Sequence, residues 1–410
     1  MKVPGGHLTY CTNIHPGETW AEISAQVRRW VPLVKRRVAP DRPFGVGLRL
    51  SAVAAAELAR PGVLEAFADF LAASGLYVFT INGFPYGPFH GRPVKEGVYL
   101  PDWQDEARLD YTDGLAALLA RLLPDGMEGS VSTVPGSFKP WAAAHGAAER
   151  MAGLMIRHVA GLVRLREETG RTIVLALEPE PCCFLETVAE TVAFFGHHLH
   201  SSVAAARLAA ETGLAPAAAA EALHRHLGVC LDLCHAAVEY EEPRLAVSEL
   251  RRAGIRIAKL QLTAGLRLAP VGPGARDLLA PFADAVYLHQ VVERGAGGLR
   301  RFADLEEAFA TLPGAGDKAS GEGASGEGAS GDREWRVHFH VPLFADGFGG
   351  LGSTRRFVAD VLALHREAPV SAHLEVETYT WDVLPEDLRA IETDAAIARE
   401  LTWVTQQLAP

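Results

Sequence analysis

Short apolar runs alternate with long amphipathic stretches along most of the chain, and this alternation limits the fold more than any other feature of the sequence. The predicted strands are residues 8–12, 44–50, 77–81, 129–133, 172–178, 229–233, 255–262 and 371–377. Strands that alternate with helices form parallel βαβ units, and eight such units favour a closed (β/α)8 TIM barrel. An open, doubly wound sheet is the alternative, although no glycine-rich turn follows the first run to support a dinucleotide site.

The segment between the seventh and eighth predicted strands is too long for one βα unit. Residues 286–292 and 337–341 have strand-like patterns, so we expect an extra β-hairpin inserted between strands 7 and 8. Residues 313–334 consist mainly of glycine, serine, alanine and glutamate, which predicts a disordered loop. With these additions, residues 1–410 are expected to form a single TIM barrel domain.

Composition narrows the range of partners. Hydrophobic residues make up 49% of the 410 residues and charged residues 22%, as in a globular protein with a sizeable core. The net charge of −11 argues against nucleic acid or an anionic membrane as a partner. No long apolar segment predicts membrane insertion, and no secretory signal is evident, so we expect a cytoplasmic protein. A homo-oligomer is compatible with these features.

The five cysteines do not indicate a disulfide framework or a structural zinc site. Their number is odd, the chain is long, and the C-x-x-C spacing of structural zinc sites is absent. We therefore expect the cysteines to be buried as small apolar residues.

Acidic residues end three of the predicted strands: Glu178 the fifth, Asp232 the sixth, and Glu375 with Glu377 the eighth. Burying a carboxylate is costly unless it is paired or holds a cation. The carboxyl ends of barrel strands meet at one rim, so these oxygens could bind one divalent metal ion. Glu375 and Glu377 share a strand face, and Glu377 is favoured because it is nearer the strand end. Helix capping or pairing with arginine is the alternative for Glu178.

Polar and aromatic side chains also gather where the barrel rule places a binding site. The candidates for substrate binding are His15, Asn82, His90, His235, Lys259 and Trp381. Asp232 and His235 lie three residues apart at a strand end, so both can face one cavity, although His235 could instead be a structural histidine. In the insertion, His338 and His340 lie on one strand face, and His340 is a further candidate metal ligand.

The rim residues resemble those of the xylose isomerase-like TIM barrels. In that superfamily a glutamate, an aspartate, a histidine and a glutamate end strands five to eight and hold one divalent metal ion. Glu178, Asp232 and Glu375 or Glu377 match three of these positions, and Asp232-Leu-Cys-His235 matches the D-x-x-H pattern of the epimerases. The seventh strand departs from the pattern because Lys259-Leu-Gln261 stands where histidine is expected. Gln261 could supply an oxygen, His340 could replace the imidazole, or the metal could be lost.

More narrowly, the chain resembles the EboE family of metabolite traffic proteins. The segments that carry the resemblance are Cys11-Thr-Asn-Ile-His-Pro-Gly-Glu18, Thr80-Ile-Asn-Gly-Phe-Pro-Tyr-Gly87, Leu177-Glu-Pro-Glu-Pro181, Cys230-Leu-Asp-Leu-Cys-His235 and Leu374-Glu-Val-Glu-Thr-Tyr-Thr-Trp381. These proteins are associated with the biosynthesis and export of small metabolites.

Together, the resemblances imply a metal-dependent isomerase or epimerase that acts on a sugar, sugar phosphate or cyclitol. The metal ion would be Mn, Mg, Zn or Co, and Glu178 and Glu377 would transfer the proton from opposite sides of the substrate. Two alternatives remain open: a non-catalytic carrier of a small polyhydroxylated metabolite, and a metal-dependent phosphoester hydrolase.

Overall fold

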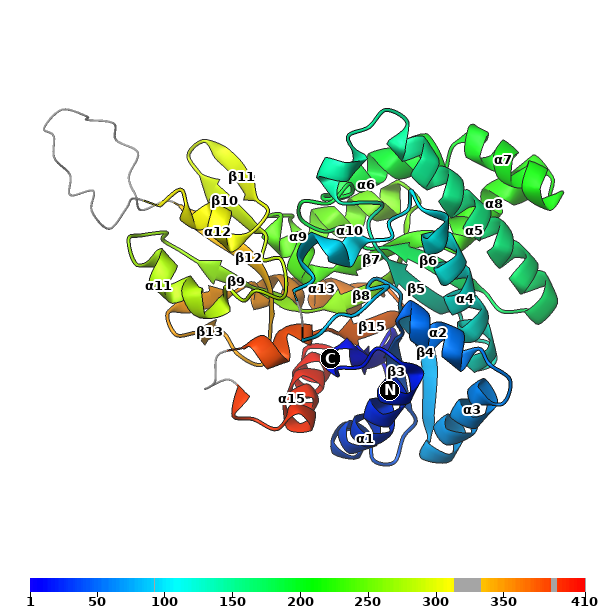
Figure 1. The fold of residues 1–410 in the computed structure, drawn as a ribbon, viewed down its shortest axis with the longest axis horizontal. Coiled ribbons are helices and arrows are strands. Elements are labelled where there is room, and N and C mark those ends of the chain that lie inside the picture. The colour runs from blue at the N-terminus through cyan, green and yellow to red at the C-terminus, as the bar shows by residue number, and fades with distance from the viewer. Residues whose placement is uncertain (92, 313–332, 385–388, 410) are drawn as a thin grey trace, which may run out of the picture.

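The predicted barrel is present in the computed structural model, which describes residues 1–91, 93–312, 333–384 and 389–409 (Figure 1). Within these residues, eight strands pair in parallel in chain order. They are β2 (Gly6–Tyr10), β3 (Phe44–Arg49), β4 (Leu76–Asn82), β5 (Gly129–Thr133), β6 (Ile173–Leu177), β7 (Leu227–Asp232), β8 (Arg256–Leu262) and β15 (His373–Val376). A parallel bridge between Cys11 and Gly47 joins β2 to β3, so the sheet curls into a barrel rather than staying open. The short strand β1 (Lys2–Val3) pairs antiparallel with β2.

Helices surround the barrel and follow its strands in sequence (Figure 1). They are α1 (Trp20–Val38), α2 (Ala52–Leu58), α3 (Val63–Ser74), α4 (Glu106–Leu122), α5 (Ala147–Thr169), α6 (Val188–Phe194), α7 (Ser202–Thr212), α8 (Pro216–His226), α9 (Leu233–Val238), α10 (Pro243–Arg252), α13 (Arg355–Glu367) and α15 (Thr393–Gln407). Helix α1 shows how the sequence specifies them. Thr19 and Glu22 form a capping box at its start, and its buried residues recur at helical spacing. None of the described helices is long and apolar enough to cross a membrane.

The insertion is larger than the predicted hairpin. Among the described residues it forms a six-stranded sheet in the order β11-β10-β12-β9-β14-β13, with antiparallel pairing. Its strands are β9 (Ala264–Leu268), β10 (Val291–Gly295), β11 (Gly298–Phe302), β12 (Glu334–Val341), β13 (Gly347–Phe348) and β14 (Leu351–Ser353), accompanied by the short helices α11 (Ala275–Leu279) and α12 (Leu305–Phe309). Figure 1 shows this sheet beside the barrel.

Of the two strands expected in the insertion, residues 337–341 lie in β12, whereas only Val291 and Val292 of the range 286–292 lie in β10, which pairs with β12. The others were missed because their sequences lack an apolar alternation; β11, for example, is Gly-Leu-Arg-Arg-Phe and mostly exposed. The loop predicted at 313–334 lies outside the described residues up to residue 332, and Glu334 already belongs to β12.

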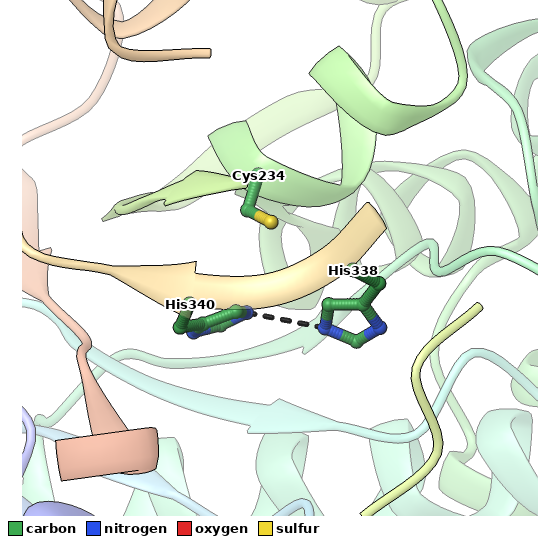
Figure 2. A group of neighbouring side chains, drawn as sticks. All are labelled: Cys234, His338 and His340. Carbon is green, nitrogen blue, oxygen red and sulfur yellow. Dashed lines mark hydrogen bonds between the residues drawn. The ribbon is translucent and has the colours of Figure 1, made fainter. Parts of the chain in front are cut away.

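Strand β12 carries the insertion to the mouth of the barrel. His338 and His340 project from the same side of this strand (Figure 2). The ring Nδ1 of His340 donates to the Glu377 carbonyl at 2.8 Å, and the Thr380 hydroxyl donates to the His340 carbonyl. These bonds join the end of β12 to the segment that follows β15.

A buried carboxylate on α15 strengthens the same junction. Glu400 Oε1 accepts hydrogen bonds from the Leu343 backbone N–H at 3.0 Å and from the Thr378 hydroxyl at 2.8 Å. Leu343 follows β12 and Thr378 follows β15, so one side chain links both segments to the C-terminal helix.

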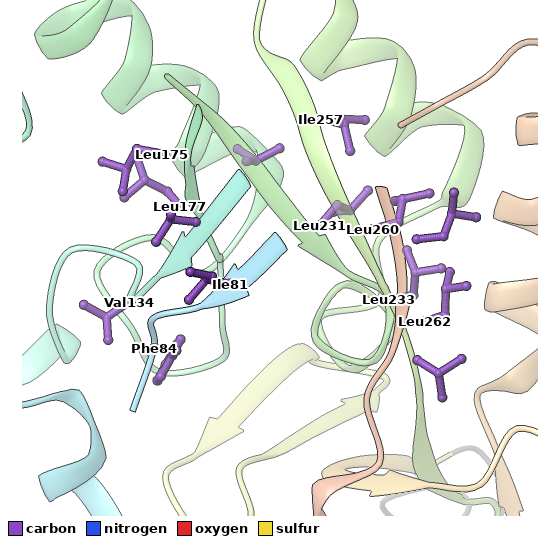
Figure 3. Close-up of a cluster of buried hydrophobic side chains, with 14 of the residues drawn as sticks. Ile81, Phe84, Val134, Leu175, Leu177, Leu231, Leu233, Ile257, Leu260 and Leu262 are labelled. Atoms are coloured by element: carbon purple, nitrogen blue, oxygen red, sulfur yellow. The ribbon is translucent and has the colours of Figure 1, made fainter. Parts of the chain in front are cut away.

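The apolar core lies between the strands and the helices, whereas the barrel interior is polar. Leu260 and Leu262 of β8 belong to the apolar cluster drawn in Figure 3, together with Leu231 of β7. Lys259 and Gln261 alternate with these leucines and are fully buried. Because side chains alternate across a strand, they point to the other face, into the barrel. Polar groups therefore occupy the interior below the rim.

The Glu400 junction generates a pH prediction. Burial raises the pKa of Glu400 from 4.5 to about 7. Between these values the folded protein retains a proton that the unfolded chain has released, so rising pH favours unfolding. Glu400→Gln removes this effect while keeping an acceptor for both hydrogen bonds. The free energy of unfolding of Glu400→Gln, relative to wild type, should therefore rise from about pH 5 to about pH 8, by at most about 3 kcal/mol. Urea unfolding measures this difference, and a constant difference across that range would contradict the assignment.

Candidate metal centre

Glu178, Asp232 and Glu377 come together at the mouth of the barrel. They lie at the carboxyl ends of β6, β7 and β15, and their exposed fractions are 3%, 0% and 4%. One oxygen of each lies within 4.8 Å of an oxygen of the other two. We call these three residues the carboxylate cluster.

Asp232 both starts a helix and faces the cluster. Its Oδ1 accepts hydrogen bonds from the backbone N–H groups of Cys234 at 2.7 Å and His235 at 3.0 Å, which caps α9. Its Oδ2 is buried and has no hydrogen-bond partner among the described residues. Capping therefore uses one oxygen and leaves the other directed to a further ligand.

Glu377 and Glu178 differ in how they are held. Glu377 Oε1 accepts from the side-chain amides of Asn13 at 2.7 Å and Asn82 at 2.8 Å. Glu178 Oε2 is buried without a hydrogen-bond partner in the described part of the chain. Unpaired buried oxygens are rare in folded proteins, and a hard divalent ion would satisfy those of Glu178 and Asp232. The donor set therefore fits a divalent metal ion.

Burial and mutual repulsion make the carboxylate cluster basic. Burial, then the charges of Glu377 and Asp232, raise the pKa of Glu178 well above its ordinary value. Burial and the charge of Glu377 do the same to the pKa of Asp232. Burial raises the pKa of Glu377 to about 7, although Lys259 counteracts this. Without a cation the cluster would hold protons, and a bound metal ion would displace them.

Glu375 and Lys259 form an ion pair inside the barrel, and both side chains are fully buried. Lys259 Nζ also donates to the Ser132 hydroxyl at 3.2 Å. Burial alone would lower the pKa of Lys259, but the Glu375 carboxylate outweighs this effect and holds the pKa above its ordinary value. Glu375 therefore pairs with a lysine and lies outside the carboxylate cluster, and Lys259 is not among the residues that line the cavity described below.

Two residues are candidates to replace the histidine expected in the seventh strand, Gln261 and His340, and they occupy different places. Gln261 pairs with Asp232 in the register of β7 and β8, but its Oε1 accepts from the Cys230 thiol at 2.7 Å. Its side-chain oxygen is therefore already engaged. His340 has a ring nitrogen within 4.8 Å of ligand atoms of Asp232 and His235. Of the two, His340 is the better placed to complete a metal site.

A cavity of about 510 Å³, including its open mouth, lies above the carboxylate cluster. Its polar lining comprises Asn13, Asn82, Lys95, Glu178, Glu180, His235, His338, His340 and Glu377. Its walls are mainly apolar and aromatic: Phe84, Pro85, Phe89, Val94, Val98, Tyr99, Tyr287, Leu288 and Tyr379. Of the residues predicted to bind substrate, Asn82 and His235 are here.

Three further predicted residues lie elsewhere. The ring of His15 stacks on Trp30, and its Nε2 lies 3.0 Å from the Tyr10 hydroxyl. His90 borders a different surface hollow, and Trp381 is buried against a hollow beside α1. All three follow strands in sequence, but none of them lines this cavity.

The cavity also contains residues that are not among the predicted site residues. Asn13 and Glu180 follow β2 and β6 directly, so the same strand-end rule could have selected them. Glu180 Oε1 accepts from the Tyr99 hydroxyl at 2.6 Å and from the Gln290 amide at 3.2 Å, and burial raises its pKa to about 7. Tyr99 and Gln290 carry no sequence signal, because neither stands at the end of a barrel strand.

Comparisons with known proteins give fold neighbours and no sequence relatives. No protein-family profile matches the chain, and no curated protein sequence does. A xylose isomerase-like TIM barrel protein from Mycobacterium smegmatis in complex with magnesium is 13% identical, covers 99% of this chain and 97% of its own, and gives a TM-score of 0.48.

Two other solved structures cover 98% of this chain. An L-ribulose 3-epimerase is 14% identical over 94% of its own chain, with a TM-score of 0.45. The IolI protein with a bound zinc atom is 10% identical over 98% of its own chain, with a TM-score of 0.44. Such low identities and scores transfer neither an activity nor a metal to this chain, and the resemblance to EboE stays a prediction.

Metal binding tests the carboxylate cluster directly. Glu178→Gln should weaken Mn²⁺ binding to the metal-stripped protein by at least about 100-fold. The loss of a metal ligand should cost at least as much affinity as the loss of a residue that only hydrogen-bonds to a ligand. Isothermal titration calorimetry measures the affinity. Glu239→Gln is the matched control, because Glu239 is also buried with a pKa of about 7 but already pairs with Arg301 at 2.5 Å. Equal Mn²⁺ affinity in Glu178→Gln and wild type would contradict the site.

The buried ion pair gives a stability prediction. Lys259→Met leaves the Glu375 carboxylate buried without its cation. Glu375→Leu leaves the Lys259 ammonium group buried without its anion. Each single change should lower the free energy of unfolding by about 3–5 kcal/mol. The double variant should lose clearly less than the sum of the two, because it removes both charges. Urea unfolding of the four proteins measures this coupling, and simple additivity would show that the pair is not formed.

Proposed function

We propose that the protein is a metal-dependent isomerase or epimerase that acts on a sugar, sugar phosphate or cyclitol. The observation that carries the proposal is the carboxylate cluster: three buried acidic groups, two with unpaired oxygens, of which Glu178 and Glu377 line a cavity at the barrel mouth. Glu178, Asp232 and Glu377 would hold the ion. When bound, a divalent ion would polarise a carbonyl group and a neighbouring hydroxyl group of the substrate.

Two carboxylates are suited to move the proton. Glu178 and Glu377 follow different strands, so they reach the cavity from different directions. One takes a proton from the carbon next to the carbonyl, and the electron pair of that C–H bond moves toward the carbonyl oxygen. Return of a proton to the former carbonyl carbon, together with transfer of the neighbouring hydroxyl proton to the first carbonyl oxygen, gives an isomer. Return to the other face of the same carbon gives an epimer.

The other side chains of the cavity would orient the substrate. The amides of Asn13 and Asn82 fix one oxygen of Glu377, which leaves its second oxygen for chemistry. His235 stands in the cavity where it could contact a hydroxyl group. The aromatic walls offer flat surfaces for the C–H faces of a ring and exclude water from the proton transfer.

Charge favours a neutral polyol over a phosphorylated substrate. Among the described residues that line the cavity, Lys95 is the only lysine or arginine, and it pairs with Asp304 at 2.6 Å. Burial lowers the pKa of His235, His338 and His340, so these rings are neutral. A phosphate group would find few cationic partners, which weakens the case for a phosphoester hydrolase. The resemblance to EboE supports a role in the biosynthesis or traffic of a small metabolite.

Solvent deuterium exchange tests the proposal and separates it from a passive carrier. The manganese-loaded protein is incubated in D₂O with unphosphorylated ketopentoses, ketohexoses and inososes. We expect deuterium to appear on the carbon beside the carbonyl of at least one compound, detected by NMR. Glu377→Gln should slow the exchange by about 10²–10⁴-fold. A compound that binds without exchange would identify a carrier, and full exchange in Glu178→Gln would contradict the mechanism.

A further inference from the structure

Three histidine rings meet beside the carboxylate cluster. His235 comes from α9, and His338 and His340 come from β12. The Nε2 atom of His338 lies 3.0 Å from Nε2 of His235 and 3.2 Å from Nε2 of His340. None of the three residues is more than 4% exposed. We call these residues the imidazole cluster.

Hydrogen bonds on the far side of each ring fix where the protons are. Nδ1 of His235 lies 3.0 Å from the Pro179 carbonyl, and Nδ1 of His340 lies 2.8 Å from the Glu377 carbonyl. A carbonyl oxygen only accepts, so both Nδ1 atoms must carry a hydrogen. In a neutral ring the other nitrogen, Nε2, is then an unprotonated lone pair.

The third ring is fixed in the same way. Nδ1 of His338 lies 2.7 Å from Oε1 of Gln290. The amide nitrogen of Gln290 donates to the Pro181 carbonyl and to Glu180, each at 3.2 Å, which settles which end of the amide faces the ring. His338 Nδ1 therefore donates, and its Nε2 is unprotonated as well.

The three Nε2 atoms thus turn lone pairs toward one another with no hydrogen between them. Such contacts repel unless a cation lies among them. A tetrahedral zinc ion holds its nitrogen ligands at about 2.0–2.1 Å, which places neighbouring ligand atoms about 3.3 Å apart. The observed separations of 3.0 and 3.2 Å are close to that spacing. Nδ1–H groups bonded to carbonyl oxygens are also the usual arrangement behind metal-binding histidines.

Carboxylates border the imidazole cluster on two sides. Glu180 has an oxygen within 4.8 Å of ring nitrogens of His235 and His338, and Asp232 has one within 4.8 Å of His235 and His340. Either could supply a fourth ligand. Cys234 also lies near His338 and His340, but it lies across the β12 ribbon from their rings (Figure 2). Its side chain packs in an apolar cluster with Val238 and Val292.

We propose that His235, His338 and His340 form a second metal site, which binds a zinc-type divalent ion next to the carboxylate cluster. Imidazole nitrogen favours Zn²⁺ and similar borderline ions, whereas the all-oxygen carboxylate cluster favours Mn²⁺ or Mg²⁺. Asp232 lies within reach of both sites, so the two ions would be neighbours. The site depends on the geometry of the rings and not on the proposed isomerase activity.

Spectroscopy and competition titration test this site without an activity assay. Metal-stripped wild-type protein is titrated with Co²⁺, and we expect the intense visible absorption of tetrahedral cobalt with nitrogen ligands. Zn²⁺ should abolish this absorption at one equivalent. His338→Gln and His340→Gln should each weaken Zn²⁺ binding at this site by at least about 100-fold, measured against a chromophoric chelator. Glu178→Gln should keep the cobalt absorption.

His226→Gln is the matched control. Nδ1 of His226 also bonds to a backbone carbonyl, that of Ile173, at 2.7 Å, and its buried Nε2 also has no hydrogen-bond partner among the described residues. It lies at the end of α8, outside the imidazole cluster, so its replacement should leave Zn²⁺ affinity unchanged. Wild-type protein that shows no tetrahedral cobalt spectrum, or His338→Gln and His340→Gln variants with wild-type Zn²⁺ affinity, would overturn the proposal. Loss of Mn²⁺ binding alone would instead count against the carboxylate cluster and leave this site standing.

Discussion

Three carboxylates are buried beside one another at the barrel mouth, and no lysine or arginine makes an ion pair with them in the described part of the chain. Burying like charges at such distances is unfavourable, so the group must hold either protons or a cation. The surroundings supply only neutral support, through two asparagine amides and the N–H groups that start α9. The nearby lysine, Lys259, is committed to Glu375. This division leaves the cluster with a negative charge that a divalent ion would neutralise.

The insertion adds two imidazole groups to the mouth of the barrel that the eight barrel strands do not supply. In β8, the seventh strand of the barrel, Gln261 stands where a histidine is expected, and it bonds to Cys230. This strand therefore brings no imidazole to that point of the rim. Strand β12 brings two, and Glu377, Thr380 and Glu400 hold its end in place through hydrogen bonds to the barrel and to α15. The same strand also contributes to one wall of the cavity. A displacement of β12 would therefore disturb both proposed metal sites and the cavity.

Much of this arrangement could be predicted from the sequence, because it follows from periodicity. Apolar runs that end in Glu178, Asp232 and Glu377 predict a common rim once the strands are known to be parallel. The period of two correctly places Glu375 and Glu377 on one face, but it cannot give their depth; two residues along the strand separate an interior ion pair from a rim ligand. His15 and Trp381 lie outside the cavity for another reason: each belongs to a segment that connects a strand to the next helix, and the path of such a segment is set by packing that no repeat encodes. Tyr99 reaches the cavity from such a segment, and Gln290 bonds to Glu180 from another.

The most direct test of the account is a crystal structure of the protein soaked with Mn²⁺, with anomalous diffraction locating the ion. The account predicts a single strong manganese peak with one oxygen each from Glu178, Asp232 and Glu377 within about 2.0–2.5 Å, the range of hard divalent ions with oxygen ligands. A manganese peak elsewhere, or carboxylates that point away from one another with no ion between them, would contradict it.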